Sequence, residues 1–215
     1  MGLTRDVSFP TPDGLTLEGV LHLPPSTPAP GAVVCHPHPL YGGDLHNNVV
    51  VALCQALAAR GVAALRFNFR GVGGSQGAFD NGIGERTDAA SALDHLRTLP
   101  EVDAERLALA GYSFGAVIAL LAASPQLRAL VAISAPTTED WSSSASVSCP
   151  ILLMAGDSDE YGEPEPLRQL AGALGAQAEV AIVPGADHFW WGHEAALAAL
   201  VGDFLVAALA VVPSP

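Results

Sequence analysis

The stretch Gly-Tyr-Ser-Phe-Gly at residues 111–115 decides how the rest of this sequence is interpreted. It directly follows a mostly apolar run at residues 106–110, which predicts a short buried strand. A serine on a sharp turn between a strand and a helix needs flanking glycines, because a side chain there would obstruct the bend and the packing of the helix. Such a turn projects the hydroxyl beyond the edge of a sheet, so the stretch predicts a serine nucleophile at Ser113.

Apolar runs alternate with helical patterns along most of the chain. Buried strands are predicted at residues 32–35, 62–67, 106–110, 130–133, 151–155 and 180–183. Helices are predicted at residues 47–59, 85–99, 116–123, 166–174 and 195–209. Residues 15–23 alternate as an antiparallel edge strand does. This order predicts an α/β fold: a mostly parallel sheet with helices on both faces and functional residues at the carboxyl ends of the strands.

Length and composition predict one globular domain over residues 1–215. Half of the residues are apolar and 14% are charged, which favours a packed core over disorder. The formal net charge of −13 argues against a nucleic-acid partner, which needs a basic surface. The first residues form no apolar leader, and the apolar run at residues 204–212 is too short to span a bilayer. We therefore expect a cytoplasmic protein without membrane association; its oligomeric state stays open.

Two groups of residues resemble metal ligands at first sight. Cys35, Cys54 and Cys149 lack the paired spacing of zinc or disulfide motifs, which predicts buried free thiols. His36 and His38 are alternate residues of an extended segment, so their side chains point apart, and no third ligand follows nearby. The sequence predicts no metal site.

The glycine-rich segment at residues 68–77 follows a predicted strand, as a dinucleotide-binding loop does. Its spacing is wrong for that role, because Gln76 stands where the third glycine would be needed, and the chain has no P-loop motif. We expect a structural turn in which Arg70 pairs with a nearby carboxylate rather than binding an anionic substrate.

A serine nucleophile needs an imidazole that accepts its proton and a carboxylate that orients the imidazole. His188 lies in the loop after the last predicted strand and is the predicted base. The acid is expected after the preceding strand, among Asp157, Asp159 and Glu160. We favour Asp159, because Asp157 stands in a Gly-Asp-Ser sequence, where an Asp typically caps the turn through its own backbone. Asp187, next to the base, is expected to cap its own loop. The order nucleophile, acid, base is that of α/β-hydrolases.

The oxyanion of an acyl-transfer intermediate needs two backbone amide donors. The amide after the nucleophile, that of Phe114, is one of them. The second is expected from the loop at residues 36–43, whose prolines have no N–H to donate. His38 or Leu40 therefore supplies it, and we favour His38.

Together these segments resemble the small bacterial hydrolases of the α/β-hydrolase superfamily. The resemblance spans nearly the whole chain and rests on His-Pro-His-Pro-Leu at 36–40, Asn-Phe-Arg-Gly-Val-Gly at 68–73, Gly-Tyr-Ser-Phe-Gly at 111–115 and Gly-Ala-Asp-His-Phe at 185–189. It implies Ser113 as nucleophile, Asp159 as acid, His188 as base, and Phe114 and His38 as amide donors. Pro37 stands where many relatives have glycine.

Many relatives carry a helical cap after the sixth strand, but residues 134–150 are too few for one. We therefore expect no cap domain and an open site. Apolar side chains at its rim would contact a short acyl or alkyl group, although core or surface packing is an equal alternative for the aromatic ones. The candidates are Leu40, Tyr41, Trp141, Phe189, Trp190 and Trp191.

The sequence thus predicts a serine esterase that cleaves small carboxylic esters through an acyl-enzyme and needs no cofactor. Thioester or amide hydrolysis would use the same residues, and only the pocket would decide between them. The sequence does not favour a dienelactone hydrolase, because those enzymes carry a cysteine where this chain has Ser113. A non-catalytic binding protein on the same fold is the alternative of another class, but such proteins usually lack one of the three catalytic side chains, all present here.

Overall fold

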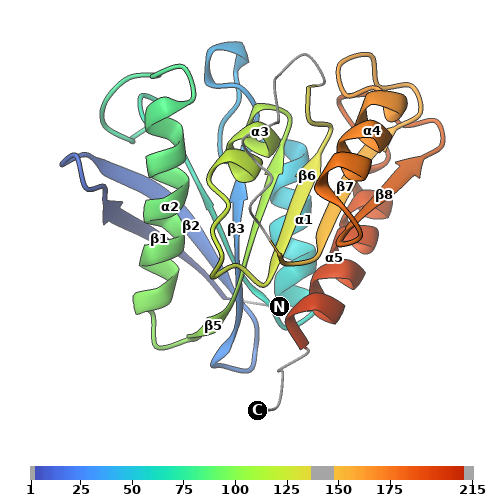
Figure 1. Cartoon of the computed structure of the whole chain (residues 1–215). Coiled ribbons are helices and arrows are strands. Elements are labelled where there is room, and N and C mark those ends of the chain that lie inside the picture. Colours follow the sequence, from blue (N-terminus) through green and yellow to red (C-terminus); the bar gives the residue numbers. More distant parts are fainter. Residues whose placement is uncertain (1–2, 137–147, 211–215) are drawn as a thin grey trace.

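Eight strands form one sheet in the order β1-β2-β4-β3-β5-β6-β7-β8 in the computed structural model, which describes residues 3–136 and 148–210 (Figure 1). The strands are β1 (Leu3–Pro10), β2 (Thr16–Leu23), β3 (Ala29–Cys35), β4 (Ala63–Phe67), β5 (Val102–Tyr112), β6 (Ala129–Ile133), β7 (Ile151–Gly156) and β8 (Ala178–Val183). β1 pairs antiparallel with β2 and β2 with β4, whereas all pairs from β4 to β8 are parallel. The predicted mostly parallel sheet is confirmed.

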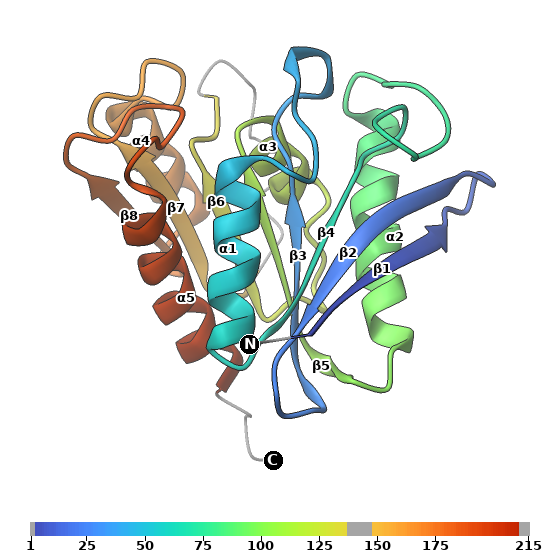
Figure 2. The same ribbon diagram turned by 180° about the vertical axis from the view of Figure 1, so that it is seen from behind.

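Helices cover both faces of this sheet. Two of them, α1 (Asn48–Ala59) and α5 (Glu194–Ala210), pack side by side on one face (Figure 2). The other face carries α2 (Ile83–Thr98), α3 (Phe114–Leu121) and α4 (Pro164–Leu174) (Figure 1). No cap domain interrupts this arrangement, since residues 134–150 between β6 and β7 are too few to build one. Among the described residues, no helix is long and apolar enough to cross a membrane.

The prediction of an edge strand at residues 15–23 was wrong in one respect. β2 is antiparallel, as expected, but it is an inner strand, and the edge belongs to β1. β1 could not be recognised from hydrophobic periodicity, because most of its side chains are exposed and Phe9 alone is buried. Pairing with the neighbouring strand, rather than burial of its own side chains, holds β1 in the sheet.

The central strands are buried on both faces and divide the core in two. Along β5, Leu107 and Leu109 face the α2 side, whereas Ala108 and Ala110 face the α1 side. This alternation of large and small side chains follows from the period of two in a strand. The three cysteines are buried and unpaired, as predicted.

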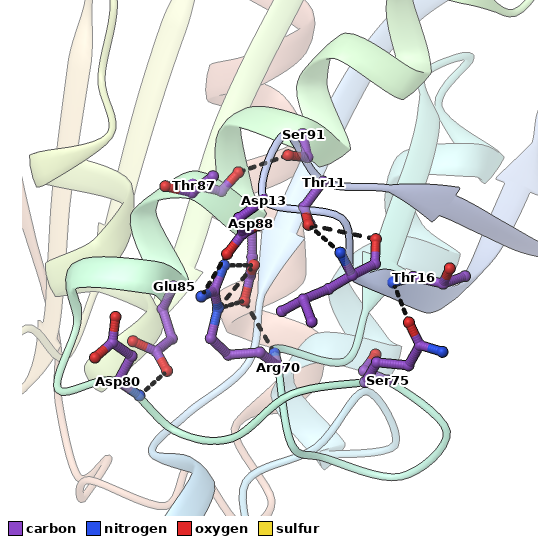
Figure 3. Close-up of polar contacts among 12 residues, drawn as sticks. Thr11, Asp13, Thr16, Arg70, Ser75, Asp80, Glu85, Thr87, Asp88 and Ser91 are labelled. Carbon is purple, nitrogen blue, oxygen red and sulfur yellow. Dashed lines mark hydrogen bonds and ion pairs between the residues drawn. The ribbon is translucent and has the colours of Figure 1, made fainter.

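A buried ion pair holds the loop after β4 against α2. Arg70 Nη2 lies 2.8 Å from Asp88 Oδ1, and the Arg70 amide donates to Asp88 Oδ2 at 2.9 Å (Figure 3). A second carboxylate, that of Asp13, accepts from Nη1 at 3.0 Å. Hydrogen bonding to Asp88 raises the pKa of the guanidinium further. The prediction that Arg70 pairs with a carboxylate is confirmed, and positive φ angles at Gly71 and Gly77 fit the predicted structural turn.

We expect Asp88→Ala to lower the free energy of unfolding by about 3–5 kcal/mol, because it leaves the buried Arg70 guanidinium without its main partner. The matched control is Asp94→Ala, which removes a carboxylate that is 74% exposed and paired to Arg97 on the same helix. That variant should lose less than about 1 kcal/mol. Urea unfolding of both variants measures the difference, and equal losses would show that burial of the Arg70–Asp88 pair contributes nothing.

Candidate active site

Ser113 occupies a strained turn between β5 and α3. Its φ is +54°, a value that residues with a side chain rarely adopt. A β-carbon on Gly111 would overlap the carbonyl of Gly115, and one on Gly115 would overlap the carbonyl of Cys35 at the end of β3. The Ser113 amide donates to Ile133 O of β6 at 2.9 Å. Both flanking glycines are therefore sterically required, as the sequence indicated.

Three side chains from separate loops meet at the carboxyl ends of the parallel strands. Ser113 Oγ lies 3.1 Å from His188 Nε2, and His188 Nδ1 lies 2.9 Å from Asp159 Oδ1. These loops follow β5, β8 and β7, which parallel pairing brings to one edge of the sheet. The structure thus places the three predicted residues in one continuous hydrogen-bonded chain.

Asp159 is buried, and three hydrogen bonds within the described residues converge on one carboxylate oxygen, Oδ1. Oδ1 accepts from the Tyr161 amide at 3.0 Å and from the Gly162 amide at 2.8 Å, in addition to His188. Burial by itself raises the pKa of this carboxyl, but hydrogen bonds from His188, Ser134 and the Gly162 amide together hold the pKa below its usual value. The site therefore keeps Asp159 ionised next to the imidazole.

The other carboxylates near the site have different roles. Asp157 is exposed, and its Oδ1 accepts from the Gly185 amide at 2.8 Å, so it joins the loop after β7 to the loop after β8 instead of capping its own turn as predicted. Asp187 accepts from the backbone amides two and three positions further along, at 3.0 and 3.1 Å, and caps its loop as predicted. Glu160 is exposed to solvent. Asp159 is the carboxylate that reaches His188.

The loop after β3 brings His38 next to the residue that follows the nucleophile. The His38 ring packs against the Phe114 ring with 4.9 Å between centroids, and against the Tyr41 ring with 4.7 Å. His38 Nδ1 accepts a hydrogen bond of 3.2 Å from the Leu40 amide. Of the two amides that the sequence left open as oxyanion donors, that of Leu40 is therefore already engaged.

His36 is a structural residue rather than a ligand. Its ring is buried, Nε2 accepts from the Phe69 amide at 3.1 Å, and Nδ1 lies 2.6 Å from the carbonyl of Pro37. With these partners Nδ1 carries the proton and both ring nitrogens are occupied. Burial lowers the pKa of His36 to about 4. Within residues 3–136 and 148–210, no group of three histidine, cysteine or acidic side chains could hold a metal ion.

Two residues that sequence reasoning missed or placed wrongly support the site. Tyr112 is buried and donates its hydroxyl to the His188 carbonyl at 2.6 Å. Trp190 was predicted at the substrate rim, but it is fully buried and donates Nε1 to Ser134 Oγ at 2.9 Å. An aromatic residue in a loop has the same sequence signal whether it faces the core or the solvent, so no periodicity could have separated the two.

A cavity of about 1140 Å³ opens beside Ser113 and His188. Its lining comes from the loop after β3, the start of α2, α3 and the His188 loop. Of the predicted rim residues, Leu40, Tyr41 and Phe189 line this cavity and are exposed. Trp191 is exposed outside the lining, and Trp141 lies outside the described residues.

The fold and the position of Ser113 at the end of β5 define a serine hydrolase of the α/β-hydrolase class. The sequence profile of the family described as X-Pro dipeptidyl-peptidase (S15 family) matches residues 13–153. The chain belongs to this family, and so to the α/β-hydrolase superfamily that the sequence motifs resemble.

Three proteins illustrate what the chain is similar to in sequence and in structure. An uncharacterized protein of Rickettsia prowazekii is 37% identical over 211 residues, which cover 93% of this chain and 88% of that protein. The structure of an α/β serine hydrolase without lid from Xanthomonas campestris matches with a TM-score of 0.84 and 32% identity, covering 98% of this chain and 97% of that one. A thiohydrolase of Arthrinium phaeospermum is 37% identical over 139 residues, 62% of this chain and 43% of that protein.

We expect the imidazole of His36 to stay neutral at pH 5, where a histidine of the unfolded chain is charged, given its usual pKa of about 6.5. Between that value and the folded pKa of about 4, only the unfolded state binds the proton. Folding stability therefore falls as the pH is lowered through this window. An NMR titration of the ring carbons of His36 in the folded protein, with the urea-unfolded chain as reference, measures the shift. A midpoint near that of the unfolded chain would contradict it.

Proposed function

We propose that this protein hydrolyses small carboxylic esters through an acyl-enzyme intermediate on Ser113. The observation that carries the proposal is the hydrogen-bonded chain from Ser113 Oγ through His188 to Asp159, with distances of 3.1 and 2.9 Å. Its serine end borders an open cavity. The match to serine hydrolases without a lid supports hydrolysis as the reaction class.

In the first half-reaction, Ser113 Oγ attacks the carbonyl carbon of the ester while His188 Nε2 takes the hydroxyl proton. The tetrahedral intermediate collapses, the bond from carbon to the leaving oxygen breaks, and His188 returns the proton to the departing alcohol. Water then attacks the acyl carbon and gives its proton to His188. The bond from the acyl carbon to Oγ breaks, Oγ regains its proton, and the carboxylic acid leaves.

Two neighbouring groups would stabilise the charges that form in these steps. Asp159 holds the proton of His188 on Nδ1, which leaves Nε2 free to accept from the serine, and it stabilises the imidazolium that results. The backbone amides of Phe114 and His38 are the proposed donors to the oxyanion. His38 is preferred to Leu40 because the Leu40 amide already donates to the imidazole of His38.

Thioester hydrolysis is the second candidate. The observation that favours it is the similarity to a thiohydrolase of Arthrinium phaeospermum. The same attack by Ser113 would serve, since a thiolate leaves the tetrahedral intermediate at least as readily as an alkoxide. The shape and polarity of the cavity decide which acyl donors bind productively.

The wild-type protein should hydrolyse 4-nitrophenyl butyrate and take up a single fluorophosphonate adduct, measured by intact mass. Ser113→Ala should abolish the adduct and lower kcat/KM by about ten-thousand-fold or more, because it removes the nucleophile. Ser158→Ala, which removes an exposed hydroxyl in the Asp159 loop, is the matched control. It should still form the fluorophosphonate adduct and keep the kcat/KM of the wild type.

Wild-type turnover of the butyryl thioester at a much higher kcat/KM than the ester would favour the second candidate. A wild-type protein with neither adduct nor turnover would sink the hydrolase mechanism and favour a binding protein on this fold.

A second pair of variants tests the role of the acid. Asp159→Asn should lower kcat by about a thousand- to ten-thousand-fold, because the amide no longer fixes the tautomer of His188 or stabilises its charged form. Asp157→Asn changes an exposed carboxylate two positions away and should keep kcat within about twofold of the wild type. Steady-state kinetics with 4-nitrophenyl butyrate compares them, and similar losses in both variants would contradict the assignment of the acid to Asp159.

A further inference from the structure

Arg86 differs from every other arginine of the chain in the part that the structure describes. All nine cationic side chains are arginines. Six of the other arginines pair with a carboxylate. Arg66 donates to the His22 ring and the Leu45 carbonyl, and Arg128 donates to the Glu105 carbonyl. Arg86 has no such partner among residues 3–136 and 148–210, and it is exposed.

Arg86 lines the cavity that contains Ser113 and His188. The start of α2 lies against side chains of α3, because a β-carbon on Gly82 would come within 3.6 Å of Ile118 Cδ1 and 4.0 Å of Phe114 Cε2. Gly82, Ile83 and Arg86 line the same cavity, so the first turn of α2 presents Arg86 to it. Because Arg86 and Ser113 line one cavity, a molecule that fills the cavity can contact both.

The charge around this arginine is unusual for the chain. The protein has 22 acidic residues and a net charge of −13, yet none of the described residues that line the cavity is an aspartate or a glutamate. The adjacent Glu85 is buried, and its two oxygens accept from the amides of Asp80 and Gly82, each at 2.8 Å. Arg86 is thus the one residue with a permanent charge in the described lining of the cavity.

Apart from Asn81, the side chains that line the cavity on α3 and on the segment before α2 are mostly apolar. Phe79 and Phe114 pack with 5.7 Å between ring centroids, and Val117, Ile118 and Leu121 of α3 continue the same wall. Such a wall accepts a hydrocarbon chain or ring. A cation at the end of an apolar wall is complementary to a molecule with an apolar body and one negative end.

We propose that Arg86 is a specificity-determining residue that binds an anionic group of the substrate, a carboxylate or phosphate carried on the acyl or the alcohol part of the ester. The inference rests on the proposed function and narrows its substrate class. The planar guanidinium donates two parallel hydrogen bonds to such a group. Arg70 is no alternative, because its guanidinium is buried and already paired with Asp88.

Two matched pairs of esters test the proposal, one for each position of the anion. 4-Nitrophenyl hemiadipate carries a terminal carboxylate and is compared with 4-nitrophenyl hexanoate, a neutral ester of the same acyl length. 4-Acetoxybenzoate, with the carboxylate on the leaving group, is compared with phenyl acetate. In at least one pair, Arg86→Gln should lower kcat/KM for the anionic ester roughly tenfold, mainly through KM, and leave the neutral ester within about twofold of wild type.

Arg168→Gln is the control for the change in net charge, because Arg168 is exposed on α4 and outside the cavity lining. It should leave all four substrates unchanged, whereas equal losses in both variants would indicate only a long-range charge effect and would overturn the proposal. The proposal is also overturned if Arg86→Gln affects neither anionic ester or affects the neutral partners equally. Absence of turnover of all four esters by the wild type would instead reject the proposed function.

Discussion

The structure of the site depends on the close approach of three backbones around Ser113. The turn holds this serine at a positive φ, which costs on the order of 1–3 kcal/mol. The hydrogen bond from the Ser113 amide to β6 and the contact of Gly115 with the end of β3 compensate for that cost. Because β3, β5 and β6 are buried on both faces, the core of the protein enforces the conformation of the nucleophile turn.

Two buried aspartates show how the surroundings of a carboxylate decide its role. Asp88 faces a permanent cation, Arg70, whose position is fixed by the loop after β4, and the pair only holds that loop against α2. Asp159 faces amides and an imidazole, whose charge can change. A carboxylate that faces a permanent cation, as Asp88 does, already has its charge neutralised and is structural. A carboxylate that faces an imidazole, as Asp159 does, can stabilise a positive charge that appears during a reaction.

The described lining of the open cavity differs in charge from the protein as a whole. A surface with a net charge of −13 repels anions at long range. Within the cavity, the described lining has one cation and no carboxylate, and an apolar wall leads toward it. Short-range pairing with Arg86 would then favour a substrate with a single negative group over one that is neutral, while the overall field disfavours polyanions.

The sequence by itself determined the features that depend on neighbouring residues. Glycines on both sides of Ser113 specify a tight turn whatever surrounds it, and apolar runs of strand length specify buried parallel strands. The sequence could only favour Asp159 over Asp157, and tertiary structure decided which carboxylate meets His188: Asp159 is buried and bonded to the imidazole, whereas Asp157 is exposed and bonded to the Gly185 amide. Tertiary structure also decided that Trp190 turns inward, because burial in a loop follows from packing across the whole chain and leaves no periodic pattern.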